Sequence, residues 1–296
     1  MSNRWWEITV VCDPMLEETV FWRLNLFGCS GTATHPGETH KVVAYIPDLR
    51  IQEADLVSLQ QSLVTDAQTQ EASIESVAWQ IIEEEDWASG WKQYWQPQTI
   101  GDRFLVYPAW LEPPADTERL IIRLDPGAAF GTGTHATTQL CLESLEMRLT
   151  SGAEDIAIAD IGCGSGILSL GAMLLGAKEA IGVDNDPLAV KTCRANCLLN
   201  DVNQEAITIE EGSIGDLVSR GHQYDGVLCN ILADIIVNLF PHFNEITHEK
   251  SWAILSGILI EQADRIADVV ESNGWTIATI WKRDPWCCFN IRRSQY

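Results

Sequence analysis

Residues 158–186 read IADIGCGSGILSLGAMLLGAKEAIGVDND, and this stretch decides the fold. It predicts a buried strand that ends at Ile161, a turn with glycine at every second position, an apolar helix, and a second strand that ends at Asp184. A strand, a helix and a strand in this order form a βαβ unit, whose ligand-binding turn lies at the carboxyl end of the first strand. We therefore expect the rest of the chain to extend a parallel sheet around this unit.

Three glycines form the predicted turn: Gly162, Gly164 and Gly166. Glycine adopts positive φ without steric cost and lets the backbone approach a ligand closely. The helix that follows presents its free N–H groups to the same place. The spacing Gly-x-Gly-x-Gly differs from the Gly-x-Gly-x-x-Gly of dinucleotide-binding proteins, in which the third glycine serves helix packing.

Acidic side chains flank this turn. Asp160 precedes the glycines in the first strand, and Asp184 ends the second strand 22 positions after Gly162, where a ribose diol would be hydrogen-bonded. Asp186 precedes Pro187, a good first helical residue, so we assign Asp186 to helix capping. The pattern resembles the cofactor motif of S-adenosylmethionine-dependent methyltransferases. The resemblance implies that Asp160 and the glycines contact the amino acid moiety of S-adenosylmethionine, and that Asp184 binds its ribose.

The composition limits the possible partners. A net charge of −23, from 42 acidic and 19 basic residues, argues against a nucleic-acid backbone as the main partner. Such a surface would attract a basic protein, although solubility alone explains the charge equally well. No apolar run reaches membrane length without glycines or charges, so we expect no membrane partner. Nine scattered cysteines and no signal peptide indicate a reducing, cytoplasmic setting.

The sequence shows no pattern of metal ligands. Cys193 and Cys197 share a helical face at i, i+4, but no second ligand pair stands near them in sequence. We interpret them as small buried apolar residues rather than as half of a zinc site. The six histidines show no metal spacing either, so we expect no metal.

The first 82 residues predict a small α+β domain. Its expected elements follow one another as strand 5–11, helix 14–27, strands 31–34 and 41–46, helix 53–68 and strand 74–82. The order β-α-β-β-α-β suggests a ferredoxin-like domain. Nothing in it looks catalytic, so it either holds the substrate or contributes only to the fold.

Residues 83–98 predict a linker helix, which leads to a catalytic domain over residues 99–296. Trp87, Trp91 and Trp95 fall on one helical stripe, which we interpret as packing between domains rather than as a ligand site. Pro97 then ends the helix.

The catalytic domain begins with two apolar strands, over residues 104–107 and 120–124. A Gly/Thr-rich loop follows over residues 125–138. It is either an ordinary surface loop or one that folds over a ligand, because it leads into a helix that is connected directly to the glycine turn. Further strands are expected after Asp184, over residues 207–210, 226–229, 252–255, 276–281 and 287–291, the last two forming an antiparallel pair.

Several segments together resemble a known family. The segments are EEDWASGWKQYW, DPGAAFGTGTHATT, DIGCGSGIL, GVDNDP, CNILA and LSGIL, in this order. They are similar to the methyltransferases that act on large-subunit ribosomal protein eleven, and the resemblance covers residues 83–290. It implies a Rossmann-like, seven-stranded, mostly parallel α/β methyltransferase domain after a small ferredoxin-like recognition domain. The implied activity is trimethylation of lysine side chains and of the N-terminal amine of the ribosomal protein.

The resemblance also implies the positions that bind the cofactor. Thr138, Gly162, Asp184 and Asn230 would bind S-adenosylmethionine, and Ser213 would lie in the loop where the pocket closes around adenine. Three of these positions stand at predicted strand ends, since Gly162 and Asn230 directly follow strands and Asp184 ends one.

The chemistry can be argued from Asn230. A methyl-accepting amine must be neutral, and deprotonating a free lysine at neutral pH costs roughly 4 to 5 kcal/mol. Desolvation and hydrogen bonds to the neutral amine lower this cost, whereas an adjacent carboxylate would retain the proton. The side-chain carbonyl of Asn230 and the backbone carbonyl of Ile231 meet this requirement and are the predicted catalytic groups.

The segment Asn-Ile-Leu-Ala is similar to the Asn/Asp-Pro-Pro-aromatic motif of other amine methyltransferases. It lacks the prolines, and Ala233 stands where an aromatic ring would stack on a planar base. An aliphatic amine is therefore a better substrate than a flipped adenine.

Other interpretations remain open. The βαβ unit is compatible with an NAD-type oxidoreductase, and the acidic surface with a non-catalytic protein that captures a basic partner. A methyltransferase could also act on a small amine or on another protein, and Asn230 could be a loop or cap residue. We expect a cytoplasmic monomer.

Overall fold

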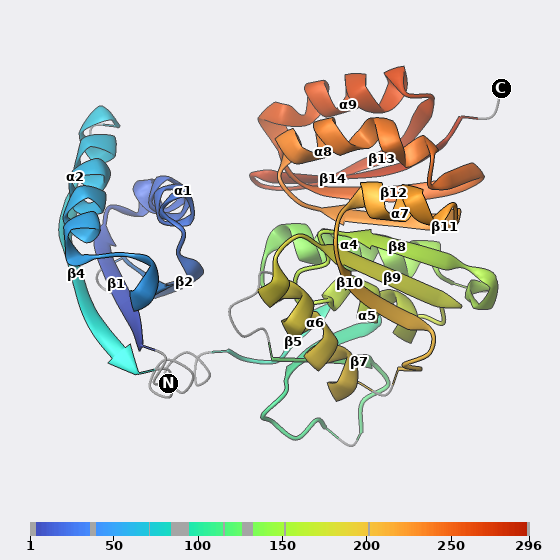
Figure 1. The fold of residues 1–296 in the computed structure, drawn as a ribbon, viewed down its shortest axis with the longest axis horizontal. Helices are drawn as coiled ribbons and strands as arrows, with labels where there is room; N and C mark the ends of the chain where they lie inside the picture. The colour runs from blue at the N-terminus through green and yellow to red at the C-terminus, as the bar shows by residue number, and fades with distance from the viewer. Residues whose placement is uncertain are drawn as a thin grey trace. The chain divides into compact units, whose positions relative to one another are not determined.

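The computed structural model describes residues 4–35, 40–70, 72–83, 95–114, 116–125, 133–150, 152–200 and 202–294. The chain divides into two compact units, Met1–Trp95 and Gln96–Tyr296. Figure 1 follows the elements of both units from blue at the N-terminus to red at the C-terminus.

The N-terminal unit is an antiparallel sheet with the strand order β2-β3-β1-β4 and two helices. Its elements are β1 (Arg4–Cys12), α1 (Glu17–Phe27), β2 (Ser30–His35), β3 (Lys41–Pro47), α2 (Glu53–Thr69) and β4 (Ile74–Glu83), with 3-10 turns at Pro14–Leu16 and Asp48–Arg50. The predicted order β-α-β-β-α-β is confirmed.

The core of this unit lies between its sheet and its helices. Leu24 of α1 and Leu63 of α2 are buried in one cluster with Ile8 of β1. Arg23 joins the helices, because its guanidinium donates to both carboxylate oxygens of Asp66 at 2.7 and 2.6 Å. The apolar sides of the two helices therefore pack against the sheet.

The C-terminal unit is built on a seven-stranded sheet with the order β10-β9-β8-β11-β12-β14-β13. Its strands are β8 (Ala157–Ile161), β9 (Glu179–Asp184), β10 (Ile207–Glu211), β11 (Tyr224–Asn230), β12 (Thr247–Leu259), β13 (Trp275–Arg283) and β14 (Trp286–Arg293). Neighbouring strands from β10 to β12 are parallel, and β14 is antiparallel to both its neighbours. The predicted Rossmann-like α/β fold is confirmed.

Helices cover both faces of this sheet. Their bounds are α4 (Ala136–Arg148), α5 (Ile167–Leu174), α6 (Pro187–Leu199), α7 (Ile214–Arg220), α8 (Ala233–Leu239) and α9 (Ala263–Ser272), with 3-10 turns at Ala153–Asp155, Phe240–Asn244 and Ile260–Gln262. Alternate residues of a strand point to opposite faces. Ala159 and Ile161 of β8 belong to the apolar cluster that contains residues of α7, α8 and α9. Asp160 therefore faces the other side, where Ser169 of α5 bonds to it.

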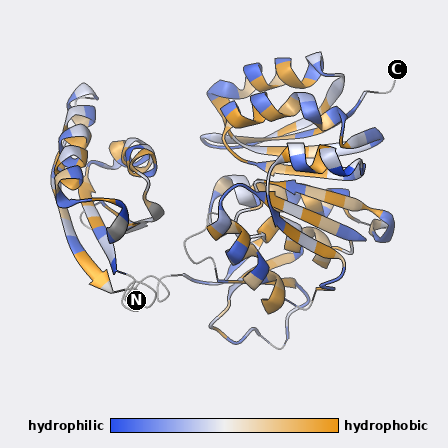
Figure 2. Ribbon diagram, viewed as in Figure 1, coloured by the Kyte–Doolittle hydropathy of each residue, from blue (hydrophilic) through white to orange (hydrophobic). Residues whose placement is uncertain are grey.

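Central strands of the sheet are apolar on both faces. Val227, Leu228 and Cys229 of β11 are fully buried, as are Ile254 and Leu255 of β12. Figure 2 shows the hydropathy of these strands in the same view. Continuous apolar runs of this kind are typical of parallel strands that are covered on both sides.

A separate three-stranded sheet precedes the βαβ unit. It consists of β5 (Gln98–Ile100), β6 (Phe104–Pro108) and β7 (Leu120–Leu124), with β6 central. The two predicted apolar strands are confirmed as β6 and β7, and β5 was not predicted. Glu146 of α4 fixes the turn between β5 and β6, because its carboxylate accepts hydrogen bonds from the N–H groups of Asp102, Arg103 and Phe104 at 2.9, 2.8 and 3.2 Å.

Asn196 of α6 and Asn200, which follows this helix, bind the backbone around β7. Asn200 accepts from the N–H of Arg123 at 2.9 Å and donates to its carbonyl at 2.7 Å. Asn196 accepts from the N–H of Asp125 at 2.9 Å and donates to the carbonyl of Ser165, inside the glycine turn, at 2.8 Å. Backbone groups at this strand therefore find partners in side chains.

The structure describes only the two ends of the predicted linker helix over residues 83–98, and these ends are not helical. Glu83 ends β4, residues 95–97 have no regular secondary structure, and Gln98 begins β5. Pro97 explains the C-terminal part, since proline disfavours the helical conformation at the residue before it. Trp87 and Trp91 lie outside the described residues, while Trp95 is buried.

Across the described ranges, no helix has the length and apolar character needed to span a membrane.

Candidate active site

The glycine turn lies at the carboxyl end of β8. Gly162, Gly164 and Gly166 have φ angles of +73°, +54° and +84°, in the left-handed region that favours glycine. The N–H of Gly162 donates to the carbonyl of Val183 at 2.8 Å, which ties the turn to β9. A Cβ on Gly166 would lie 2.4 Å from the sulfur of Cys193. Gly166 is therefore required for packing against α6, and an approach of this turn to a ligand stays a prediction.

The carboxylate of Asp184 holds this turn from the end of β9. One oxygen accepts from the N–H of Gly164 at 2.9 Å, and the other from the N–H of Asp186 at 3.0 Å. Asp186 caps α6 through the N–H of Leu188 at 2.8 Å, which confirms the predicted capping role. Because each carboxylate oxygen has more than one acceptor site, Asp184 retains capacity for ribose hydroxyls.

Asp160 is buried below the turn, with 1% of its surface exposed. Its Oδ2 accepts from both the N–H and the hydroxyl of Ser169, at 3.1 and 2.6 Å. Burial raises the pKa of Asp160 to about 6; the bonds from Ser169 oppose the rise, and the charge of Asp184 adds to it. A direct contact of Asp160 with the cofactor stays a prediction.

Asn230 ends β11, the strand next to β8. Cys229 pairs with Ile161 in the parallel register, so Asn230 and Gly162 lie at the same edge of the sheet. The side-chain N–H of Asn230 donates to the hydroxyl of Thr138 at 3.4 Å. Its Oδ1 is buried without a hydrogen-bond partner among the described residues. An unpaired buried acceptor costs roughly 1–3 kcal/mol, which a bound N–H or O–H group would relieve.

Ile231 packs between two glycines at strand ends. A Cβ on Gly162 would lie 2.4 Å from Cγ2 of Ile231. A Cβ on Gly257, which has φ +82° and follows Ser256 within β12, would lie 2.2 Å from the carbonyl oxygen of Ile231. The turn after β8 and the segments at the ends of β11 and β12 therefore meet at Ile231.

Thr138 reaches the same place from the first turn of α4, which His135 caps. Thr138 is fully buried. The hydroxyl of Ser256 lies 3.4 Å from the carbonyl of Thr137 and can donate to it, and Ser256 pairs with Asn230 in the sheet. Residues 126–132 of the predicted Gly/Thr-rich loop lie outside the described residues.

Ser213 is placed beside Asp184 rather than beside Asn230. It precedes α7, and its N–H donates to Asp216 at 2.8 Å. The N–H of Gly212 donates to the carbonyl of Asp184 at 2.9 Å, which joins the end of β10 to the end of β9. The role of Ser213 near adenine stays a prediction.

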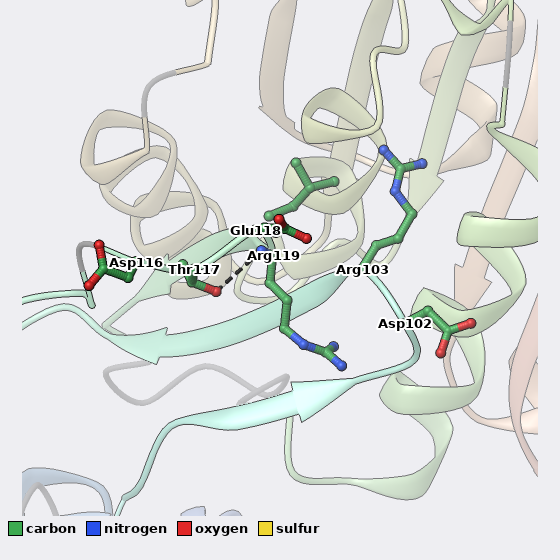
Figure 3. A pocket seen from close by; sticks show the side chains of 7 residues that line it. Asp102, Arg103, Asp116, Thr117, Glu118 and Arg119 are labelled. Carbon is green, nitrogen blue, oxygen red and sulfur yellow. Dashed lines mark hydrogen bonds between the residues drawn. The ribbon is translucent and has the colours of Figure 1, made fainter.

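A pocket of about 460 Å³ lies at the small sheet and is lined by Arg103 and Arg119, among other residues (Figure 3). Arg119 donates to the backbone carbonyls of Gly101 and Phe104. The sequence predicts no functional role for this pocket. Among the residues that the structure describes, no group of three or more His, Cys, Asp or Glu side chains could hold a metal ion.

A family model described as Ribosomal protein L11 methyltransferase (PrmA) matches residues 4–294. The chain belongs to this family. It is 47% identical to the ribosomal protein L11 methyltransferase of Cyanothece sp., over 99% of this chain and 100% of that protein. It is 45% identical to the protein of the same name from Thermosynechococcus vestitus, over 99% and 98% of the two chains. A solved structure of ribosomal protein L11 methylase from Lactobacillus delbrueckii subsp. bulgaricus matches with a TM-score of 0.62 and 29% identity, covering 68% of this chain and all of that one.

Family membership confirms the predicted enzyme class, an S-adenosylmethionine-dependent protein methyltransferase. The oxidoreductase and the non-catalytic binding protein are therefore the wrong alternatives. The residues present fit S-adenosylmethionine. The three glycines keep the turn free of bulky side chains, Asp184 offers acceptors, and Oδ1 of Asn230 is a buried acceptor with no partner among the described residues.

Three residues near this site were not singled out from the sequence: Ser169, Ser256 and Gly257. Ser256 and Gly257 lie within LSGIL, a segment quoted for the family resemblance. The rule that ligands bind at the carboxyl ends of parallel strands could have identified them. Ser169 left no such signal, because its role depends on the way α5 packs on β8.

Proposed function

We propose that this enzyme methylates ribosomal protein L11, at lysine side chains and at the N-terminal amine, up to the trimethylated state. The names of its relatives support this substrate. The observation that carries the proposal is the buried, unpaired Oδ1 of Asn230, which can accept a hydrogen bond from an amine N–H.

S-adenosylmethionine, when bound, supplies a methyl group on a positively charged sulfur. The turn from Gly162 to Gly166 and the carboxylate of Asp184 would hold it at the carboxyl edge of the sheet. The residues of the chain then need only present the amine in line with that methyl group. Such positioning can supply most of the rate enhancement.

Asn230 suits a neutral nucleophile. A lysine ammonium first loses its proton to water, and its N–H groups then donate to Oδ1 of Asn230 while the lone pair remains available. Because an amide carries no charge, it does not stabilise the ammonium as a carboxylate would. Thr138 holds the amide N–H group, so Oδ1 remains directed at the substrate.

The direct experiment incubates purified enzyme with ribosomal protein L11 and S-adenosylmethionine and follows the intact mass of L11. We expect successive additions of single methyl groups. A protein that binds S-adenosylhomocysteine but leaves L11 unchanged would contradict the substrate. Parallel reactions with free lysine test the small-amine alternative, which predicts equal turnover of both.

We also propose that residues 1–82 recognise the substrate, that residues 83–98 link them to a catalytic part over residues 99–296, and that the enzyme acts as a cytoplasmic monomer. The charge of the N-terminal unit supports the first point, since residues 1–95 carry 15 acidic and five basic side chains. A surface of this sign attracts a lysine-bearing protein. Weakened L11 binding at higher salt, with unchanged cofactor binding, would be the expected signature.

A further inference from the structure

Two exposed apolar side chains stand two and five positions after Asn230. Leu232 is 65% exposed and Ile235 is 44% exposed. Leu232 precedes α8, and the N–H of Ile235 donates to the carbonyl of Leu232 at 3.0 Å, so both belong to the first turn of this helix (Figure 1). Residues three apart on a helix are neighbours on its surface. Leu232 and Ile235 therefore form one small apolar surface, called here the ledge.

The fold does not require apolar residues at the ledge. Ala233 and Ile236 are the side chains of α8 that are buried, with 3% and 0% exposed. They face the sheet, and Leu232 and Ile235 consequently lie outside the core. A single exposed apolar residue is ordinary on a protein surface. Leu232 and Ile235 are a pair, and they lie next to Asn230, the residue proposed to receive the substrate amine. This position indicates that they contact the substrate.

The carboxylate beside the ledge has a cationic partner within the unit. Asp234, between the two apolar residues, forms a salt bridge with Arg265 of α9. A lysine ammonium approaching Asn230 therefore meets an amide and an apolar surface, with the nearby carboxylate already paired. This favours the uncharged form of the amine.

Successive methylation removes N–H groups from the target amine, so the contacts that position it must change from one addition to the next. A neutral primary amine has two N–H groups and a neutral monomethylamine has one, so both can donate to Oδ1 of Asn230. A neutral dimethylamine has none. The last methyl transfer must therefore position the amine by apolar contact, because the hydrogen bond is lost while apolar surface is gained.

We propose that the ledge binds the methylene stem and the methylated nitrogen of the target amine, and that Leu232 and Ile235 thereby determine how far methylation proceeds. Its occupant is the segment of the ribosomal protein substrate that carries this amine. The inference rests on the proposed function, since it takes L11 as the methyl acceptor. The ledge is continuous with Asn230, because Leu232 stands only two positions after it, so the segment whose amine reaches Asn230 also reaches the ledge.

The test uses Leu232→Ala, Ile235→Ala and the double variant in the full-length enzyme. Leu198→Ala is the matched control, because Leu198 is 74% exposed and lies in the last turn of α6, towards the opposite edge of the sheet. Each variant is titrated with S-adenosylhomocysteine, checked for thermal unfolding, and assayed with L11 by intact mass and by the rate of each methyl addition.

We expect the ledge variants to bind S-adenosylhomocysteine as the wild type does and to accumulate mono- and dimethylated L11. The third addition should slow about tenfold in the double variant, and the first addition much less. Leu232→Met should restore trimethylation. Trimethylation at the rate of Leu198→Ala, or an equal loss at all three additions, would overturn the inference. Failure of the proposed function looks different, because the wild type itself would then leave L11 unmethylated.

Discussion

The side-chain amide of Asn230 donates to the hydroxyl of Thr138 across 3.4 Å, although the two residues are 92 positions apart in the chain. This contact joins the end of β11 to the first turn of α4. In this orientation the amide nitrogen is engaged, whereas the oxygen has no hydrogen-bond partner among the described residues.

Thr138→Val tests this orientation. The isosteric change removes the acceptor for the Asn230 amide, so Oδ1 is no longer held towards the amine. We expect kcat for L11 to fall about ten- to a hundredfold, because the active site loses one oriented polar contact. The affinity for S-adenosylhomocysteine should change little. Thr138→Ser should recover most of the activity. Parallel losses of cofactor affinity and kcat would instead assign Thr138 to cofactor binding alone.

Asn230→Ala should retain cofactor binding and lose turnover. The first two methyl additions should suffer most, because only amines with an N–H group can donate to the missing oxygen. Asn230→Asp is the companion variant. Its carboxylate would stabilise the ammonium, so the pH at which the rate reaches half its maximum should move upward. Rates are compared from pH 6 to pH 10. Equal losses of affinity and turnover in Asn230→Ala would show a binding role only.

Gly162→Ala should destabilise the enzyme and weaken cofactor binding. The new Cβ would meet Cγ2 of Ile231 at 2.4 Å, and φ of +73° is unfavourable for alanine. We expect a loss of about 1–3 kcal/mol in the free energy of unfolding. Ile231→Ala removes the clashing methyl, so the double variant should lose less than the sum of the single losses. Strict additivity in urea denaturation would contradict the packing of these two residues.

Asp160→Asn tests the buried carboxyl through pH. The native pKa of about 6 exceeds the ordinary value of 3.8, so between these values the native state holds a proton that the unfolded chain has lost. Native stability therefore falls as pH rises from about 4 to about 6, and the full cost remains above pH 6. Asparagine still accepts from Ser169 without this cost.

The Asp160→Asn variant should accordingly be more stable than the wild type at pH 7.5, by up to about 3 kcal/mol, and nearly equal to it at pH 4. Urea denaturation without cofactor at both pH values measures the difference. A gain of the same size at both pH values would exclude ionisation of Asp160 as its cause.

Much of the fold could be predicted because its signals are local. The glycines, the apolar runs of β8 and β9, and the strand-end acids each stand within one short stretch. The sequence analysis did not predict three short elements, the seven-residue helices α7 and α8 and the three-residue strand β5. Segments this short contain too few residues to reveal a hydrophobic periodicity. Helix α9 was also missed, although Ile266 and Val270 face the core at i, i+4 spacing.

The site could be predicted only in part. Strand order alone brings Gly162, Asp184 and Asn230 to one edge of a parallel sheet. The approach of Gly257 to the carbonyl of Ile231 and the contact of Thr138 with Asn230 depend on how β12 and α4 pack, which no local pattern records. The resemblance named Thr138 as a cofactor-binding position, and the structure adds its contact with Asn230.

The side chain of Asn196 has a consequence for mechanical coupling within the enzyme. One planar amide bonds the N–H of Asp125 with its oxygen and the carbonyl of Ser165 with its nitrogen. Because the two ends of an amide are rigidly connected, neither stretch of backbone can shift without pulling on the other. A displacement of the chain at Asp125 is thereby transmitted to the glycine turn through a single side chain.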